Sequence, residues 1–243
     1  MLRLLPLPVL LVGCLTAEPA PTAPDLDPRN VAETWRAVQP LGLLDLASDP
    51  DALLGEDPSC PYLLESEDSS IWTGGCVRGD GAWIEGQIQQ FRSEGELWLV
   101  ADRFTVVRPE GIELLLDGAL VQTAAGSLIG LEASLLLCGV HTPCQDGLVG
   151  LDLRYGLRLE EDGQVADVAV RGVVGLDGSE PASVDGAWRV DPLICDREPV
   201  DGLLAMQADQ RQAIELDGAD ACDGCVAWTV QGTAAASWCP ASL

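Results

Sequence analysis

The feature that most constrains the fold is a long succession of strand-like segments separated by short turns that contain glycine. From Cys60 onward, apolar and polar residues alternate with a period of two, which is typical of a β-strand that buries one face. No β-α-β spacing occurs, so the strands are expected to pair with their neighbours in an antiparallel sheet. The predicted strands are 82–91, 96–107, 112–123, 127–138, 148–159, 165–176, 184–190, 202–208, 211–216, 225–230 and 234–239.

Glycines inside these segments indicate that the sheet bends. A glycine within a strand often marks a bulge or a close approach of backbones. The sequence therefore predicts an all-β fold, an antiparallel meander that forms a strongly curved sheet or a barrel, and a two-sheet β-sandwich is the alternative. The glycines concerned are Gly86, Gly118, Gly130, Gly150, Gly156, Gly172 and Gly175.

One short helix is expected before the sheet. Asp27 is placed to cap its N-terminus, Pro28 fits the first helical position, and Pro40 ends it. The following stretch, 41–57, is rich in leucine but contains Gly42 and Pro50, so it is expected to be a loop with at most one short turn.

The N-terminus carries an export signal. Leu4 to Val12 is an apolar run of about nine residues behind Arg3, far short of the roughly 20 that a membrane-spanning helix needs. The run closes on Leu11-Val12-Gly13-Cys14, which resembles the lipobox of bacterial lipoproteins. An ordinary signal peptide cut elsewhere is the alternative.

The lipobox resemblance implies an address and an anchor. Residues 1–13 would be a signal peptide, and Cys14 would carry a thioether-linked diacylglycerol and an amide-linked acyl chain such as palmitate. The protein would be lipid-anchored in the bacterial cell envelope. Leu15 stands where inner-membrane retention signals of that family place Asp, which favours the outer membrane. The predicted organisation is 1–13 signal peptide, 14–26 lipidated Pro-rich tether, 27–59 helix and loop, and 60–243 a disulfide-stabilised β domain.

Eight of the nine cysteines remain after Cys14, an even number that suits four disulfides in an oxidising compartment. Two cysteines flank a predicted hairpin turn at 67–70, two bracket a loop of five residues, and two are centred on Gly232. The expected pairs are Cys60 with Cys76, Cys138 with Cys144, Cys225 with Cys239 and, by elimination, Cys195 with Cys222.

The last four cysteines allow two alternatives. Cys195, Cys222, Cys225 and Cys239 could hold zinc, or the Cys222–Cys225 pair could be redox-active. Because export favours disulfides over thiolates, we expect structural bridges instead.

A second resemblance covers about a fifth of the chain. Cys60-Pro61, Gly74-Gly75-Cys76, Trp83 and Gly86 form a pattern similar to one found in uncharacterised cysteine-rich bacterial envelope lipoproteins, to which the C-terminal cysteines also fit. This resemblance implies no activity.

The formal net charge of −26 excludes some partners. All 13 basic residues are arginine, against 39 acids, and such a chain repels nucleic acids and anionic head groups. The expected partners are the membrane, through the N-terminal lipid, and an envelope protein.

No catalytic, cofactor-binding or metal-ligating residue is assigned. His141, the single histidine, is expected in a solvent-facing loop between Cys138 and Cys144, where no serine stands as its nucleophile partner. Residues 217–223 are acidic but lack the spacing of a calcium loop, so an acidic turn is expected.

These observations predict a non-enzymatic envelope lipoprotein, structural or partner-binding. One alternative is a carrier of lipid or another apolar ligand, motivated by the leucine runs 114–116 and 135–137. The other is a carboxylate-based hydrolase. An open cavity lined by leucine would favour the carrier, and a filled interior would favour the first function.

Overall fold

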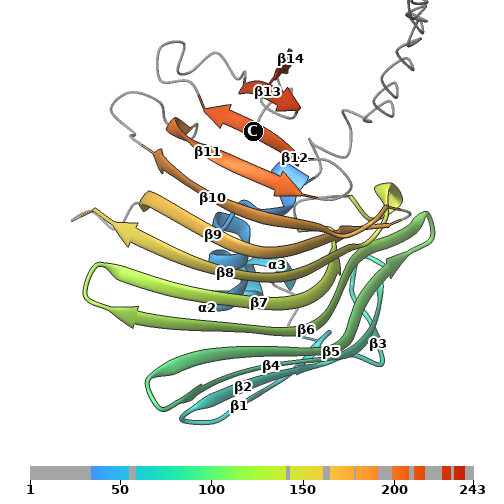
Figure 1. Cartoon of the computed structure of the whole chain (residues 1–243). Helices are drawn as coiled ribbons and strands as arrows, with labels where there is room; N and C mark the ends of the chain where they lie inside the picture. Colours follow the sequence, from blue (N-terminus) through green and yellow to red (C-terminus); the bar gives the residue numbers. More distant parts are fainter. Residues whose placement is uncertain are drawn as a thin grey trace, which may run out of the picture.

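The computed structural model describes residues 34–54, 59–140, 143–160, 165–177, 179–190, 199–207, 211–216, 226–230 and 233–238. Its strands form a single antiparallel sheet that curves around two short helices (Figure 1). The strands are β1 (Tyr62–Glu65), β2 (Ser69–Thr73), β3 (Cys76–Val77), β4 (Trp83–Ser93), β5 (Glu96–Arg108), β6 (Gly111–Ala125), β7 (Leu128–Cys138), β8 (Val149–Leu159), β9 (Val165–Leu176), β10 (Ala182–Val190), β11 (Pro199–Gln207), β12 (Arg211–Leu216), β13 (Val226–Val230) and β14 (Thr233–Trp238).

The strands lie in the sheet in chain order, except that β3 pairs with β4 beside the main path. Within the described residues, β1 pairs with β2 alone and β14 with β13 alone, so the sheet is open. The all-β antiparallel meander is therefore confirmed as a curved sheet. It is neither closed into a barrel nor split into the two layers of a sandwich.

The predicted strands correspond to β4 through β14 with small shifts at their ends. The segment predicted at 165–176, for example, is β9. Agreement is close because each segment alternates regularly and ends at a turn residue. The first hairpin is also present, but its turn is shorter than expected, because Ser69 and Ser70 already belong to β2.

The expectation of a loop over 41–57 was wrong for 41–54, and 55–57 lie outside the described residues. The structure has helices α2 (Leu41–Ser48) and α3 (Pro50–Leu54) there. Pro50 begins α3 instead of breaking a helix, since the first position of a helix needs no N–H partner. Leu43, Leu46 and Leu54 are fully buried, and this burial outweighs the low helix propensity of Gly42.

The helix expected to end at Pro40 is described from residue 34, and residues 34–37 are helical. Its predicted start at Asp27 and Pro28 lies outside the described residues. Trp35, on this helical stretch, is fully buried and packs against Trp188 of β10, with ring centroids 5.3 Å apart.

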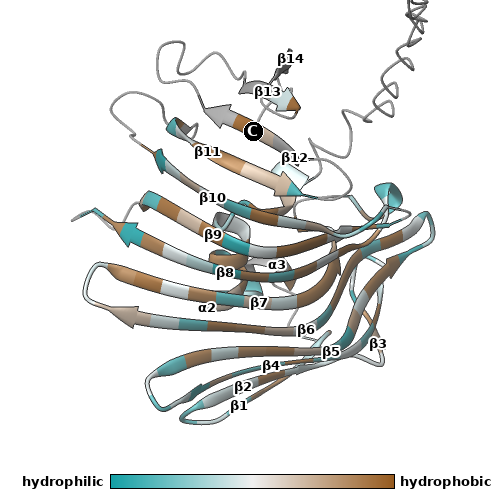
Figure 2. Cartoon of the chain, in the orientation of Figure 1, coloured by the Kyte–Doolittle hydropathy of each residue, from teal (hydrophilic) through white to brown (hydrophobic). Residues whose placement is uncertain are grey.

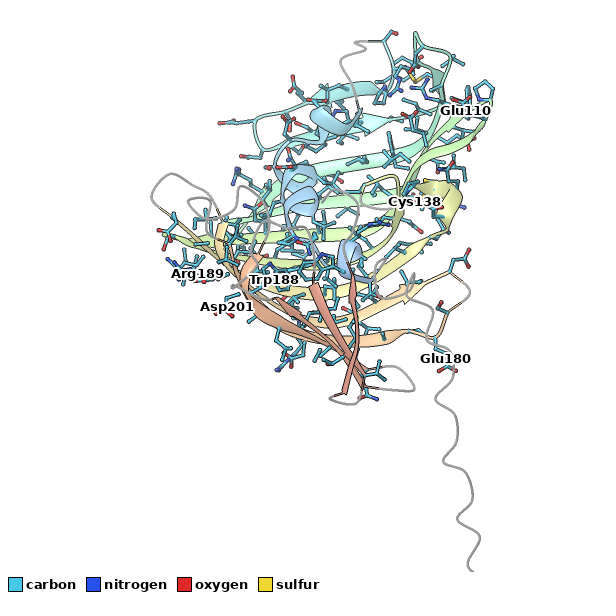
Figure 3. All side chains as sticks on the ribbon, turned by 90° about the horizontal axis from the view of Figure 1, so that it is seen from above. Glu110, Cys138, Glu180, Trp188, Arg189 and Asp201 are labelled. Carbon is cyan, nitrogen blue, oxygen red and sulfur yellow. A yellow bond between two sulfur atoms is a disulfide. The ribbon has the colours of Figure 1, made fainter. Side chains whose placement is uncertain are left out.

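The helical stretch 34–37, α2 and α3 lie on one face of the sheet, here called the inner face. The Trp72 Nε1–H of β2 donates to Asp51 of α3 at 2.7 Å, and the Gln90 amide of β4 donates to the Ala47 carbonyl of α2 at 2.7 Å. Trp35 of the helical stretch packs against Trp188 of β10 at the other end of the sheet. These contacts together show that the sheet wraps around the helices from both sides. Figure 3 shows the helices lying across the strands.

Burial alternates along the strands, so the opposite face, here called the outer face, is exposed. In β8, Leu151, Leu153 and Leu157 are buried, whereas Asp152 and Arg154 between them are exposed. Figure 2 shows the same alternation of apolar and polar residues along β6 to β11. The period of two thus separates a core face from a solvent face.

The sheet bends along a line of irregular pairing that crosses β4, β5 and β6. The register shifts between Glu85 and Gln87 of β4, and again between Ala101 and Phe104 of β5. Gly86 lies at the first shift with φ +80°, in the left-handed region that favours glycine. A Cβ on Gly86 would overlap the carbonyl oxygens of Asp102 and Arg103.

Two of the expected disulfides are present. Cys60–Cys76 joins the start of the β1–β2 hairpin to β3, with 5.9 Å between the Cα atoms, and Cys138–Cys144 closes the loop after β7, with 4.8 Å. The pairs Cys195–Cys222 and Cys225–Cys239 lie outside the described residues and stay predictions.

Replacing Gly86 with alanine is expected to destabilise the protein by about 2–4 kcal/mol, because the new Cβ meets backbone and the conformation is left-handed. Gly150→Ala is the matched control: its Cβ would lie 3.8 Å from the Gly175 carbonyl oxygen, an ordinary contact. Urea unfolding of both variants measures the difference, and equal costs would contradict the assigned role of Gly86.

Candidate functional site

The outer face of β7 to β11 carries side chains arranged in rows across the strands. Residues that pair in the register point to the same side, so every second residue of each strand contributes to a row. Three neighbouring rows make up the candidate site, which we call the charged trough: two rows of charged residues with a row of small residues between them.

The first charged row alternates in sign across four strands. The register pairs Arg158 of β8 with Asp167 of β9, Asp167 with Arg189 of β10, and Arg189 with Asp201 of β11. The Arg158 Nε lies 2.5 Å from the Asp167 carboxylate, and this hydrogen bond raises the pKa of the arginine. Figure 3 shows Arg189 and Asp201 next to each other.

The second charged row lies four residues away along the strands and crosses β7 to β10. Its members in order are Glu132, Arg154, Arg171 and Asp185. The Arg154 Nε lies 3.5 Å from the Glu132 carboxylate, and the Arg171 Nη2 lies 2.7 Å from the Asp185 carboxylate. The two arginines are neighbours, and each therefore pairs with an acid on its far side.

The row between them has almost no side chains. Gly130, Gly156, Ala169 and Ala187 follow one another across β7 to β10. Two adjoining hollows of about 790 and 670 Å³ lie over this row and share Gly156, Ala169 and Ala187. Since alternate residues are spaced by roughly 6.7 Å along a strand, the two charged rows stand roughly 13 Å apart as walls.

Exposed apolar side chains border the trough. Leu128, Val173 and Leu203 lie on the outer face of β7, β9 and β11, and each exposes between 40% and 56% of its surface. Leu203 is paired with Ala187, at the end of the small row. Arginine is enriched in protein interfaces relative to the rest of a protein surface, so arginines together with exposed apolar groups favour a protein-binding surface.

The electrostatics of the trough differ from those of the chain as a whole. Its charged rows hold four arginines and four acids, and their formal charges cancel, whereas the chain carries −26. Nearly a third of the 13 basic residues is thus concentrated on one face. A negatively charged partner is repelled less here than it would be by an average surface of this protein.

The inner face, by contrast, is filled. Leu99, Leu116, Leu120 and Leu131 are fully buried there, packed with the helices in one core. In the leucine runs 114–116 and 135–137, the residues that point inward belong to the core, whereas Leu136 points outward. These runs therefore contribute side chains to both faces of the sheet. A smaller hollow of about 310 Å³ lies beside Ser48 and the β1–β2 turn, and its lining is largely polar.

A second group of charges serves the architecture. The Arg78 Nη1 donates to the Leu54 carbonyl at 2.9 Å, which ties the end of α3 to the turn before β4. Arg78 also hydrogen-bonds Asp80 at 2.7 Å, and Arg108 reaches Asp80 at 2.8 Å and Glu113. The hydrogen bonds from Arg78 and from the Ala82 amide hold the pKa of the Asp80 carboxyl well below its usual range.

Several predicted site residues lie outside the described residues: Cys14, His141, the acidic stretch 217–223 and the cysteines at 195, 222, 225 and 239. The part of the chain that the structure describes contains no group of three or more His, Cys, Asp or Glu placed to hold a metal ion. The charged trough was missed. Its signal is a pair of charged residues four positions apart with a glycine or alanine midway between them, repeated on β8, β9 and β10, and it becomes meaningful only when the register is known.

The comparisons with known proteins identify no relative: no protein family, curated protein or solved structure matches the chain. Among the described helices, none is long and apolar enough to cross a membrane.

The side chain of Tyr155 carries a buried hydroxyl on the inner face, and its contribution to stability can be tested. Its hydroxyl is buried without a hydrogen-bond partner among the described residues, and burial raises the pKa of the phenol. Tyr155→Phe is expected to leave the free energy of unfolding unchanged or raise it by up to about 1 kcal/mol, because a buried unpaired hydroxyl is costly. Thermal unfolding measures it. A loss above about 1 kcal/mol would show that the hydroxyl has a partner.

Proposed function

We propose that the protein is a non-enzymatic, lipid-anchored envelope protein that acts by binding a protein partner through the charged trough. One observation carries this proposal: the sheet keeps its inner face for the core and presents on its outer face a neutral, grooved surface with exposed leucines. Such a surface suits the binding of another protein, since its ion pairs and apolar groups are accessible.

The structure gives the two alternative functions less support. A carrier needs an open apolar cavity, whereas the leucines of the inner face are buried in the core. A carboxylate hydrolase needs two acids that face one substrate position. In the trough, however, Asp167 and Asp185 are each engaged by an arginine at 2.5 and 2.7 Å. Because both carboxylates are paired with arginines, they suit a binding surface more than a catalytic pair.

The proposed location supports the proposed function. The lipobox at Leu11–Cys14 would place the chain at a membrane, and the Pro-rich segment 14–26 would act as an extended tether. A tether of about a dozen residues at roughly 3 Å each would hold the domain some 35 Å from the bilayer. At that distance the domain could meet other envelope proteins.

The anchor is tested by Cys14→Ser in the full chain. The variant is expected to leave the membrane fraction, or to remain uncut and held by its signal, because serine cannot form the thioether. Cell fractionation and mass spectrometry of the N-terminus report the result. An unmodified mature N-terminus beyond Cys14 in the unmutated protein would contradict the anchor.

The binding surface is tested by placing a photo-cross-linking amino acid at Ala187, in the floor of the trough, and irradiating intact envelopes. Protein adducts of defined mass are expected, because a bound partner would cover this position. The control carries the same amino acid at Glu110, in the β5–β6 turn, which Figure 3 shows away from Arg189 and Asp201. No adduct at Ala187, or equal adducts at both positions, would overturn the proposed use of this face.

A further inference from the structure

The pattern of charges in the trough also identifies a partner. We propose that the trough binds the trough of a second copy of this chain, around a two-fold axis that runs parallel to the strands between β9 and β10. This inference rests on the proposed function, since it takes the same face as the binding surface. Two-fold dimers use one patch on both subunits, so the patch must be complementary to itself.

The symmetry fixes which residues meet. An axis parallel to the strands keeps each row facing the same row of the partner, and it exchanges β9 with β10, β8 with β11, and β7 with β12. The positions in each row follow from the register of β7 to β12. Self-complementarity can therefore be checked row by row.

In the first charged row every contact joins opposite charges. Arg158 of β8 faces the partner's Asp201, and Asp167 of β9 faces the partner's Arg189. Because the row alternates in sign over an even number of strands, reversing its direction places each positive charge on a negative one. The two-fold axis repeats both contacts.

The second charged row satisfies the same test. Arg171 of β9 faces the partner's Asp185. Arg154 faces the partner's Ala205, and Glu132 faces the partner's Ala213, both of them small neutral residues. No like charges meet in either row, so the pairing adds attraction without an opposing repulsion.

The small row adds no steric clash between the two sheets. Ala169 faces the partner's Ala187, and the exposed Leu203 faces the partner's Gly156, which has no side chain. A Cβ on Gly156 would meet nothing within 4 Å in the single chain, so there is open space for the leucine. The side chain of Leu203 therefore points into the open space above the partner's Gly156.

A two-fold axis along the trough, across the strands, satisfies the charges less well. It would place Asp167 opposite the partner's Arg171 and Arg189 opposite the partner's Asp185, but it would also place Arg158 opposite the partner's Arg154, because both lie on β8 in the two charged rows. The axis parallel to the strands is preferred, since it brings no like charges together. The outer face of the six strands that this axis exchanges in pairs, β7 to β12, is roughly 29 Å wide and roughly 20–29 Å long at standard strand dimensions, and would contribute roughly 600–800 Å² per copy, within the range of specific interfaces.

The test uses the full-length lipidated protein, co-expressed in two differently tagged copies and solubilised in detergent. Unmutated copies are expected to co-purify. Arg158→Asp in both copies, or Asp201→Arg in both copies, is expected to reduce co-purification at least tenfold, because each change places like charges opposite each other twice per dimer. Arg103→Asp, on an exposed arginine in the bend of β5, is the control and is expected to change nothing.

The decisive sample combines one copy carrying Arg158→Asp with one carrying Asp201→Arg. The two reversed charges then face each other, and co-purification is expected to return to nearly the unmutated level. Damage to the fold of either copy cannot produce this rescue. Absence of rescue between variants with unchanged circular dichroism would overturn the inference.

The two proposals fail in distinguishable ways. If unmutated tagged copies do not co-purify while Ala187 cross-links to a different protein, self-association is wrong and the proposed binding function stands. If Ala187 gives no adduct and the copies do not co-purify, both are wrong. An adduct at twice the mass of the chain supports the self-association.

Discussion

The cross-strand register is the physical constraint on which the rest of this structure depends. Side chains alternate along each strand, so the register decides both which residues share a face and which residues stand next to each other across the sheet. A slip of one residue in β8 would turn Leu153 outward and Arg154 into the core. The buried face therefore fixes the register through the cost of burying charge, and the fixed register then aligns the outer rows.

The two faces of the sheet consequently have different tasks. The inner face is committed to stability, because the helices cover it and Trp35, Leu43 and Leu54 fill the space between sheet and helix. The outer face is free to vary without affecting the core, and here it holds four arginines of an otherwise acidic chain, among them the ion-paired Arg154, Arg158 and Arg171. Exposed pairs of this kind contribute little to stability, about 0–1 kcal/mol each. Their regular arrangement is the basis of the proposed binding role.

Curvature links the two faces. The irregular line through Gly86, Arg103 and Gly118 bends the sheet so that β2 and β4 reach one side of the helices while β10 reaches the other. The hydrogen bond from Arg78 to the Leu54 carbonyl holds the turn before β4 beside α3, and the disulfide Cys60–Cys76 ties the first hairpin to β3. An open sheet thereby encloses its core without closing into a barrel, and one broad face remains exposed.

The sequence alone determined the strands, their antiparallel order and two of the disulfides, because a period of two, glycine turns and close cysteine spacing are local signals. It misjudged 41–54, where Gly42 and Pro50 suggested a loop and burial against the sheet instead stabilised two helices. The charged trough was decided by tertiary structure alone. Arg158, Asp167, Arg189 and Asp201 lie on four different strands, and only the hydrogen-bonded register, set by the packing of the opposite face, brings them into one row.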